Sequence, residues 1–384
     1  MMVSGIMMML LEISNQLPAG NIHVLEIKDH SVLMEQEQRD SLNDWFYWKF
    51  KAVFKETGKW HFKFAKPNKV GTRGPAVSLD RGKTWQWSPD SRLSDREFTY
   101  DCKGPGEVWF CQGLPYLQQD WERFTAEFSG HPAATFSTLC RSRKGRNVEL
   151  LEVCEGTPPL TVVLTARHHC QEMSASMVME GILRQVFADD ENGRDFRRKI
   201  RLFVVPFTDK DGVEDGDQGK GRAPRDHGRD YAGKHIYPET AAIRSLIERE
   251  KPFLVMDLHA PWIFGLHNEN PYLVENRNQR FFPEVERFAG LMESEAPACA
   301  PFLASDTLHW GTGWNTEANY DGKSGIGSGL NLTTACGQYP FIRLAVTMEI
   351  PFANFREKTV TKAEFLQYGA ALARTILRFA DERK

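Results

Sequence analysis

The sequence has little that points to a nucleic acid, a membrane or an oxidising compartment. Its 48 basic and 51 acidic residues leave a formal net charge of only −3, so neither nucleic acid nor a membrane surface is expected as the main partner. No apolar run approaches the roughly 20 residues that span a bilayer. The seven cysteines are odd in number and form no CxxC pair, which argues against a complete disulfide framework. The short apolar run 6–11 has no basic segment before it and predicts no signal peptide. We therefore expect a reduced, cytoplasmic protein.

The chain also lacks internal repeats and low-complexity segments, so its organisation must be taken from changes in pattern. A length of 384 residues exceeds one ordinary core and predicts one large or two unequal domains. Bulky and polar residues alternate between Gly, Pro, Asn and Asp punctuation in the first part of the chain, at 23–27, 45–51, 60–64, 83–87 and 108–110. This alternation predicts a small antiparallel β-sandwich domain over residues 1–115. Seven of the ten tryptophans precede residue 125; they suit core packing, or alternatively a platform for stacking sugars or peptides.

After residue 115 the apolar runs become continuous, at 148–153, 160–165, 200–205, 253–258 and 342–350. Patterns with helical spacing lie between and beyond them, at 173–188, 239–250, 281–293 and 361–381. Strands that are apolar on both faces need helices over both faces. Residues 116–384 are therefore predicted to form an α/β domain with a mixed, largely parallel sheet covered by helices.

Polar residues follow four of the predicted strands at the point where each strand ends. Ligands of open α/β sheets sit beyond the carboxyl ends of the strands. The polar groups that would meet at this edge are His169 and Glu172, Asp257 and His259, Glu349, and a loop after Val205 that contains Arg222 and the run 225–229. This convergence is more specific than any of the short motifs alone.

Two histidines and a glutamate at these strand ends predict a metal site. His169 and Glu172 lie three residues apart in the bend between a strand and a helix. His168 is the competing ligand, but its spacing to Glu172 suits a regular helix better than a bend. His259 is the expected third ligand, with Asp257 either supporting it or capping the next turn. Two histidines and one glutamate leave the fourth zinc position open, which is typical of a catalytic site with one zinc ion.

Glu349 is the candidate general base. It lies between apolar neighbours in Thr347-Met-Glu-Ile-Pro351, where an idle carboxylate would be costly to bury. Zinc lowers the pKa of a bound water to about 7, and a base must take the proton of that water. A solvated strand edge is the alternative explanation of this residue.

Taken together, these residues resemble the zinc metallocarboxypeptidases. The ordered set is His169-x-x-Glu172, Asp226-His-Gly-Arg229, Asp257-Leu-His259 and Glu349. The longer run Ala166–Gly181, and a sandwich that contains Phe46-Tyr-Trp-Lys-Phe50 ahead of the catalytic domain, are similar to the cytosolic carboxypeptidase branch. The resemblance implies a carboxypeptidase-like fold in which His169, Glu172 and His259 bind zinc and Glu349 acts first as general base and then as acid.

The resemblance also implies two arginines that handle the substrate. Arg222 matches the arginine that polarises the scissile carbonyl and holds the oxyanion, with a solvated loop charge as the alternative. Arg229 matches the arginine that receives the terminal carboxylate of the substrate. The asparagine that usually precedes this arginine is replaced by Gly228, and His227 is the residue that could supply the lost hydrogen bond. In many relatives a tyrosine closes over the substrate; Tyr320 and Tyr339 are both available here, and the sequence pattern assigns that role to neither.

The expected function is hydrolysis of the C-terminal peptide bond of a peptide or protein by zinc-activated water. One alternative keeps the metal site but makes the protein an amide hydrolase or deacylase of small N-acyl amino acids. Another is a non-catalytic protein whose tryptophan-rich sandwich binds peptides or glycans. The stretch 310–343 is expected to line the specificity pocket, and Arg343 either favours an acidic C-terminal residue or forms a structural salt bridge. The oligomeric state stays open.

Overall fold

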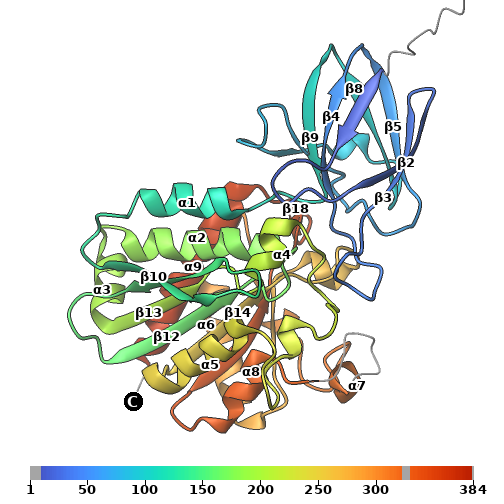
Figure 1. Cartoon of the computed structure of the whole chain (residues 1–384). Coiled ribbons are helices and arrows are strands. Elements are labelled where there is room, and N and C mark those ends of the chain that lie inside the picture. Colours follow the sequence, from blue (N-terminus) through green and yellow to red (C-terminus); the bar gives the residue numbers. More distant parts are fainter. Residues whose placement is uncertain (1–9, 322–328, 383–384) are drawn as a thin grey trace, which may run out of the picture. The chain divides into compact units, whose positions relative to one another are not determined.

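The computed structural model describes residues 10–321 and 329–382, which fall into two compact units (Figure 1). The first unit takes the chain up to Glu37 and then Phe46–Pro115. The second takes Tyr116 onward together with the short segment Gln38–Trp45. Most of the apolar run 6–11 lies outside the described residues. Among the described residues, no helix combines the length and the apolar character that crossing a membrane requires.

The first unit contains two sheets that enclose an aromatic core. One has the strand order β1-β4-β9-β6-β7, with β1 Leu11–Ser14, β4 Lys49–Phe54, β9 Gly106–Cys111, β6 Ala76–Ser78 and β7 Gln86–Trp87. The other has the order β2-β3-β5-β8, with β2 His23–Lys28, β3 Ser31–Glu35, β5 Gly58–Phe64 and β8 Glu97–Cys102. Every pair is antiparallel except β3 and β5, which run parallel. Trp48 and Trp60 are buried in this core, as the core-packing interpretation of the tryptophans predicts.

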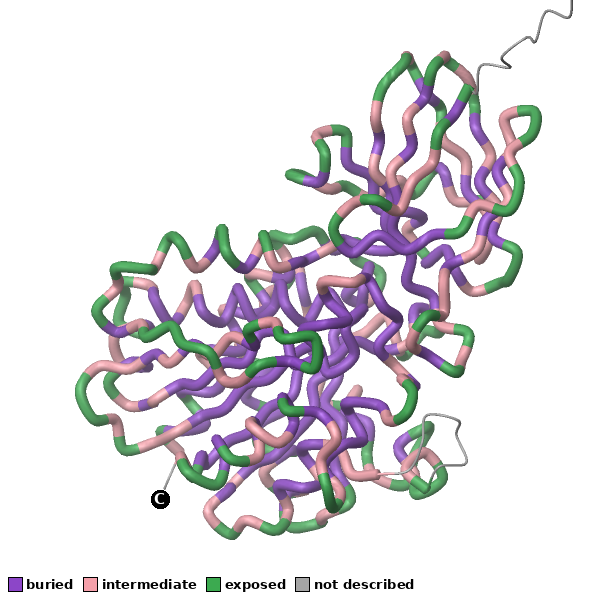
Figure 2. The backbone as a smooth tube through the Cα atoms, viewed as in Figure 1, coloured by how far each residue is buried: buried purple, intermediate pink, exposed green. Residues whose placement is uncertain are grey.

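The second unit is built on a seven-stranded sheet with the order β10-β11-β13-β12-β14-β16-β15. The strands are β10 Ala134–Arg141, β11 Asn147–Val153, β12 Leu160–Ala166, β13 Ile200–Val205, β14 Leu254–His259, β15 Tyr272–Val274 and β16 Leu344–Glu349. The four central strands β13, β12, β14 and β16 are parallel, whereas the outer strands join antiparallel. Every residue of β14 and β16 is buried (Figure 2). The predicted mixed α/β fold is therefore confirmed.

Helices cover both faces of this sheet. The helices α2 Met173–Phe187, α3 Glu191–Lys199, α6 Phe282–Glu295 and α9 Lys362–Asp381 pack against one another on one face, and α5 Pro238–Glu250 and α8 Leu332–Ala335 lie on the other (Figure 1). Shorter helices and turns occupy the connections: α1 Gln118–Ala126, α4 Lys210–Asp215, α7 Glu317–Tyr320, η2 His227–Arg229, η3 Leu266–Glu269, η4 Gln279–Phe281, η5 Ala304–Asp306 and η6 Cys336–Gln338. The small hairpin of β17 Asn354–Phe355 and β18 Lys358–Thr359 precedes α9.

The strand register brings the candidate residues to one edge. Thr165 near the end of β12 lies opposite Asp257 of β14. His259, the last residue of β14, lies opposite Glu349, the last residue of β16. Because these strands are parallel, their carboxyl ends meet at the same edge of the sheet.

Candidate metal centre and active site

The bend after β12 is held by a buried arginine that the sequence patterns did not single out. Arg167 has a left-handed backbone, with φ of 62°. Its guanidinium donates hydrogen bonds to the carbonyl of Cys170 (2.7 Å), the carbonyl of Tyr116 (2.9 Å) and the hydroxyl of Ser176 (3.0 Å). These contacts close the loop on itself and direct the next side chains inward. The signal available in the sequence was an arginine directly before two histidines.

His169, Glu172 and His259 converge as a group that could hold a metal ion. The Nδ1 atom of His169 lies 2.8 Å from one carboxylate oxygen of Glu172, and the Nδ1 atom of His259 lies 2.8 Å from the other. The two Nδ1 atoms are 3.2 Å apart. All three residues are buried. Zinc bonds of about 2.0–2.1 Å at tetrahedral angles separate neighbouring ligand atoms by roughly 3.3 Å, so this donor set fits zinc.

Two aspartates orient these histidines from behind. Asp257 Oδ2 lies 2.8 Å from Nε2 of His259, and Asp226 Oδ1 lies 3.0 Å from Nε2 of His169. An ionised carboxylate only accepts hydrogen bonds, so each Nε2 donates to its aspartate, which leaves each Nδ1 as the atom that can bind a metal once it has lost any proton. Asp226 belongs to the motif that the sequence supplied, but its support of a ligand was not anticipated.

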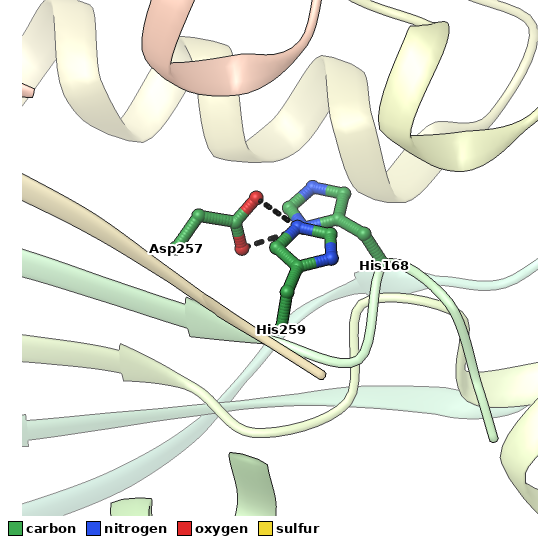
Figure 3. A group of neighbouring side chains, drawn as sticks. All are labelled: His168, Asp257 and His259. Atoms are coloured by element: carbon green, nitrogen blue, oxygen red, sulfur yellow. Dashed lines mark hydrogen bonds and ion pairs between the residues drawn. The ribbon is translucent and has the colours of Figure 1, made fainter. Parts of the chain in front are cut away.

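His168 bonds to Asp257, one of these supporting aspartates (Figure 3). Its Nδ1 atom lies 2.8 Å from Asp257, and its Nε2 atom lies 2.7 Å from the hydroxyl of Tyr231. His168, Asp257 and His259 also bring one ligand atom each within 4.8 Å of the others. In that group, however, Asp257 lies to one side of the two imidazoles and bonds to both of them, one through each carboxylate oxygen (Figure 3). This geometry favours His169 over His168, as the sequence did.

The buried charges shift one another's pKa values. Burial alone would lower the pKa of His259, but the carboxylates of Asp257 and Glu172 raise it well above its usual value. Burial would conversely raise the pKa of Asp257, but His168 and His259 hold it well below its usual range. Without metal, the centre therefore keeps its aspartate ionised and its histidine protonated.

Glu349, opposite His259 in the strand register, is the next residue of the candidate centre. It is buried, and its Oε2 atom has no hydrogen-bond partner among the described residues. Burial raises the pKa of Glu349, and the carboxylate of Glu172 adds to the rise, whereas His259 and Lys220 oppose it. A buried carboxylate with raised proton affinity suits a group that accepts and returns a proton.

The structure does not support the placement expected for Arg222 at a substrate carbonyl. Its Nη2 atom lies 2.6 Å from Asp209 and 3.5 Å from Asp40, and its Nη1 atom lies 3.1 Å from Asp217. Both terminal nitrogens therefore serve buried ion pairs with aspartates. A simple solvated loop charge is also wrong, because the side chain is only 13% exposed.

Arg229 has the features expected of a carboxylate-binding arginine. It is buried in η2, and its guanidinium carbon lies 4.4 Å from the ring centroid of Tyr320. It forms no ion pair with any described carboxylate, so its charge is available to a ligand. Tyr339 donates its hydroxyl to Glu248 at 2.6 Å, which leaves Tyr320 as the tyrosine beside the candidate site.

His227 was expected to supply the hydrogen bond that is lost because Gly228 replaces the usual asparagine. The ring of His227 stacks on Tyr237 at 3.6 Å, and its Nδ1 atom faces Asp209 at 3.8 Å. Burial lowers the pKa of His227 to about 4, so the ring is uncharged and has one N–H to donate; its contact with a substrate carboxylate stays a prediction. A side chain at Gly228 would meet Nε2 of His169 at 3.0 Å. Glycine at this position therefore leaves room for the metal ligand.

Arg343 forms a structural salt bridge. It pairs with Glu284 at 2.8 Å and donates to the carbonyl of Phe379 at 2.9 Å. The structure thus supports the salt-bridge alternative for Arg343. Of the stretch 310–343 that was expected to line the specificity pocket, residues 322–328 lie outside the described residues.

Comparison with known proteins supplies an independent line of evidence. Residues 122–235 match the family model described as zinc carboxypeptidase. The chain is 27% identical over 198 residues to cytosolic carboxypeptidase 2 of Xenopus tropicalis, across 46% of this chain and 20% of that protein. It is 23% identical over 394 residues to cytosolic carboxypeptidase 6 of Caenorhabditis elegans, across 88% of this chain and 81% of that protein. The chain thus spans only about a quarter or less of the cytosolic carboxypeptidase 2 relatives from Xenopus tropicalis and Macaca fascicularis (20% and 25%).

Solved structures show the same fold over almost the whole chain. A metallo-carboxypeptidase from Burkholderia cenocepacia superposes with a TM-score of 0.77 at 18% identity, over 97% of this chain and 99% of that chain. A metallo-carboxypeptidase from Pseudomonas aeruginosa, in complex with (2-guanidinoethylmercapto)succinic acid, gives a TM-score of 0.77 at 20% identity, over 97% of this chain and 100% of that chain. The predicted resemblance and the predicted fold are both confirmed.

Proposed function

Because residues 122–235 match the family model described as zinc carboxypeptidase, we propose that this protein is a zinc-dependent metallocarboxypeptidase that removes the C-terminal residue of peptides or proteins. The observation that carries the proposal is the convergence of three ligand atoms, from His169, Glu172 and His259, within 4.8 Å of one another. Glu349 ends the strand next to His259 in register. Ligands and base therefore come from three adjacent parallel strands.

One zinc ion is the proposed cofactor, held by His169, Glu172 and His259. When bound, zinc lowers the pKa of a water molecule and polarises the carbonyl of the substrate. Asp226 and Asp257 keep the two imidazoles in the tautomer that presents Nδ1, so the ligands are oriented before the metal arrives.

Glu349 is the proposed proton carrier. It would take a proton from the attacking water and deliver it to the amine that leaves. Its burial and the lack of a hydrogen-bond partner for Oε2 among the described residues support this role, because that oxygen is left available to a proton. A positioned general base contributes about 100-fold to 10,000-fold to a rate.

Arg229 is the proposed anchor for the terminal carboxylate of the substrate. A planar guanidinium pairs a carboxylate through two parallel hydrogen bonds. The ring of Tyr320, 4.4 Å from the guanidinium carbon, supports the guanidinium from one side. This anchor would restrict cleavage to the last peptide bond. We further propose a cytoplasmic location, which the names of the cytosolic relatives support.

The test is a panel of peptides with free or amidated C-termini, incubated with the zinc-loaded wild type and with Glu349→Gln. The wild type should release one residue at a time from free C-termini and act slowly on amidated peptides. Glu349→Gln should lose about 100-fold to 10,000-fold in kcat while its zinc content stays unchanged. Hydrolysis of N-acyl amino acids alone would favour the deacylase alternative and overturn the proposal.

A further inference from the structure

A lysine, and not the expected Arg222, is the cation that faces the metal ligands. The ammonium of Lys220 lies 4.0 Å from Oε1 of Glu172. It also lies close enough to Glu349 to lower the pKa of that carboxyl. The ammonium donates no hydrogen bond to any described residue, so its three donors are available to a ligand. Arg222, two residues later, has both of its terminal nitrogens committed to aspartates.

The backbone around Lys220 is fixed from two directions. Asp40 accepts hydrogen bonds from the amides of Gln218 (2.8 Å) and Gly219 (2.7 Å), and Ser41 donates to the carbonyl of Lys220 at 2.8 Å. On the other side, Asp226 Oδ2 accepts from the amide of Gly221 at 2.7 Å. The same aspartate bonds to the zinc ligand His169 through Oδ1. The lysine is therefore held in a fixed position relative to the metal centre.

Glycines on both sides of Lys220 allow the loop to approach the centre. Gly219 and Gly221 have positive φ angles of 80° and 65°, a conformation that other residues adopt only with strain. A Cβ atom at Gly219 would lie 2.4 Å from the backbone nitrogen of Cys170, in the loop that carries the ligand His169. Glycine thus lets the loop pack directly against the metal-binding bend.

An aromatic ring supports the lysine side chain. The ammonium lies 5.5 Å from the ring centroid of Trp45, a distance at which a cation is attracted to the face of an indole. Trp45 is itself in edge contact with Trp262 at 5.5 Å. The side chain of Lys220 is 22% exposed, so the ammonium is largely withdrawn from water but remains accessible to a ligand.

We propose that Lys220 is the catalytic residue that stabilises the oxyanion formed at the scissile carbonyl, and that Arg222 holds the loop in shape. The inference rests on the proposed peptidase function and changes the identity of its cation. Water attacks the carbonyl carbon, the electron pair of the C=O bond moves to oxygen, and the ammonium of Lys220 donates a hydrogen bond to that oxygen. A fixed cation is worth most where charge appears only in the transition state.

The experiment compares zinc-loaded wild type with Lys220→Met and Lys220→Arg. Hydrolysis of a free-ended peptide is measured together with zinc content and the calorimetric affinity for two ligands. One ligand is a phosphonate analogue of the same peptide, which mimics the charged tetrahedral intermediate, and the other is the amino acid product. Lys220→Met should lose about 100-fold to 1,000-fold in kcat, as removal of an oxyanion donor does, with a smaller change in KM. Phosphonate affinity should fall strongly, product affinity and zinc content should hold, and Lys220→Arg should recover part of the loss.

Two further variants serve as controls. Lys199 lies just before the first residue of β13, whereas the loop that carries Lys220 follows the last residue of that strand. Lys199→Met should therefore leave the rate and the phosphonate affinity unchanged. Arg222→Gln should lower the melting temperature, because it leaves Asp209 buried without its cation. Wild-type rates and phosphonate affinity in Lys220→Met would overturn the inference while leaving the peptidase function in place. Loss of zinc from Lys220→Met would also overturn it, because the lysine would then act through Glu172. A wild type that hydrolyses no peptide would overturn the function and the inference together.

Discussion

Replacing Asp257 by asparagine should weaken zinc binding without unfolding the protein. The carboxylate of Asp257 is buried and lies 2.8 Å from Nε2 of His259, 2.8 Å from Nδ1 of His168 and 2.7 Å from the hydroxyl of Thr165. Asparagine has nearly the same shape, and its carbonyl oxygen can keep the contacts to His168 and Thr165. Its amide group would then face His259 with donors in place of an acceptor.

The expected loss of zinc affinity follows from the one contact that is lost, between Asp257 and Nε2 of His259. A hydrogen bond to a charged group contributes about 1.5–3 kcal/mol, and each 1.4 kcal/mol is about tenfold in affinity. Zinc affinity should therefore fall roughly 10-fold to 100-fold, the range seen when the partner of a metal-bound histidine is removed. The fall has a structural cause: His259 would move its proton to Nδ1, the atom that faces Glu172 and the metal.

A competition titration against a chromophoric chelator measures this change, with zinc content after dialysis as a second readout. Asp230→Asn is the matched control. Asp230 is also buried, and it holds Arg225 at 2.7 Å and the amide of Ile236 at 3.0 Å. The control should lose stability but keep its zinc affinity. A dissociation constant for Asp257→Asn within twofold of the wild-type value would refute the assignment of Asp257 as the residue that orients His259.

Three further predictions concern the substrate, the metal and the fold. Arg229→Met should raise KM for free-ended peptides about tenfold or more, since it removes a charge-assisted pair of about 1.5–3 kcal/mol, and steady-state kinetics with equal KM values would contradict the carboxylate role. Asp257 and Glu172 raise the pKa of His259 against the effect of burial, so zinc must displace a proton from this imidazole at any pH below that pKa. As pH falls, zinc affinity should therefore drop about tenfold per pH unit for each proton displaced. The stability of the metal-free protein should change in the opposite direction and fall as pH rises through that pKa. Titrations at a series of pH values measure both trends. A zinc affinity independent of pH would exclude the coupling between zinc binding and proton release. Arg343→Met should lower the melting temperature but leave the ratio of rates for acidic and apolar C-terminal residues unchanged, because Arg343 pairs with Glu284.

The sheet and the convergence of the candidate metal ligands could be predicted from the sequence because both depend on short-range patterns. Continuous apolar runs located the central strands, and the polar residues that follow them must meet at one edge once the strands are parallel. His169 and Glu172 flank one bend, whereas His259 and Glu349 each end a strand, so no long-range packing detail was needed to bring them together. The supporting role of Asp226 was missed because its partner His169 is 57 positions earlier in the chain.

The roles of the loop residues could not be predicted in the same way. Whether a cation between Val205 and Tyr231 faces the metal depends on the path of the backbone, and that path is set by Asp40, which comes from a segment more than 170 positions earlier. Family spacing favoured Arg222, but three aspartates engage its guanidinium. In the sequence, only the glycines on either side of Lys220 distinguish it from the other cations of this loop. The meaning of these glycines appears only when the loop is seen against Cys170.

The carboxylate of Asp226 connects the two positions, Gly228 and Lys220, at which this chain departs from the usual family pattern. Asp226 bonds to His169 and to the amide of Gly228 (2.6 Å) through Oδ1, and to the amide of Gly221 (2.7 Å) through Oδ2. The ligand, the turn that leads into Arg229 and the loop that presents Lys220 are thus fixed by a single buried group. A larger residue at 228 would press on His169 and Asp226, both 3.0 Å from its Cβ position. The absence of asparagine there therefore follows from the close packing of these three elements, and the cation at 220 lies on the loop that this packing holds in place.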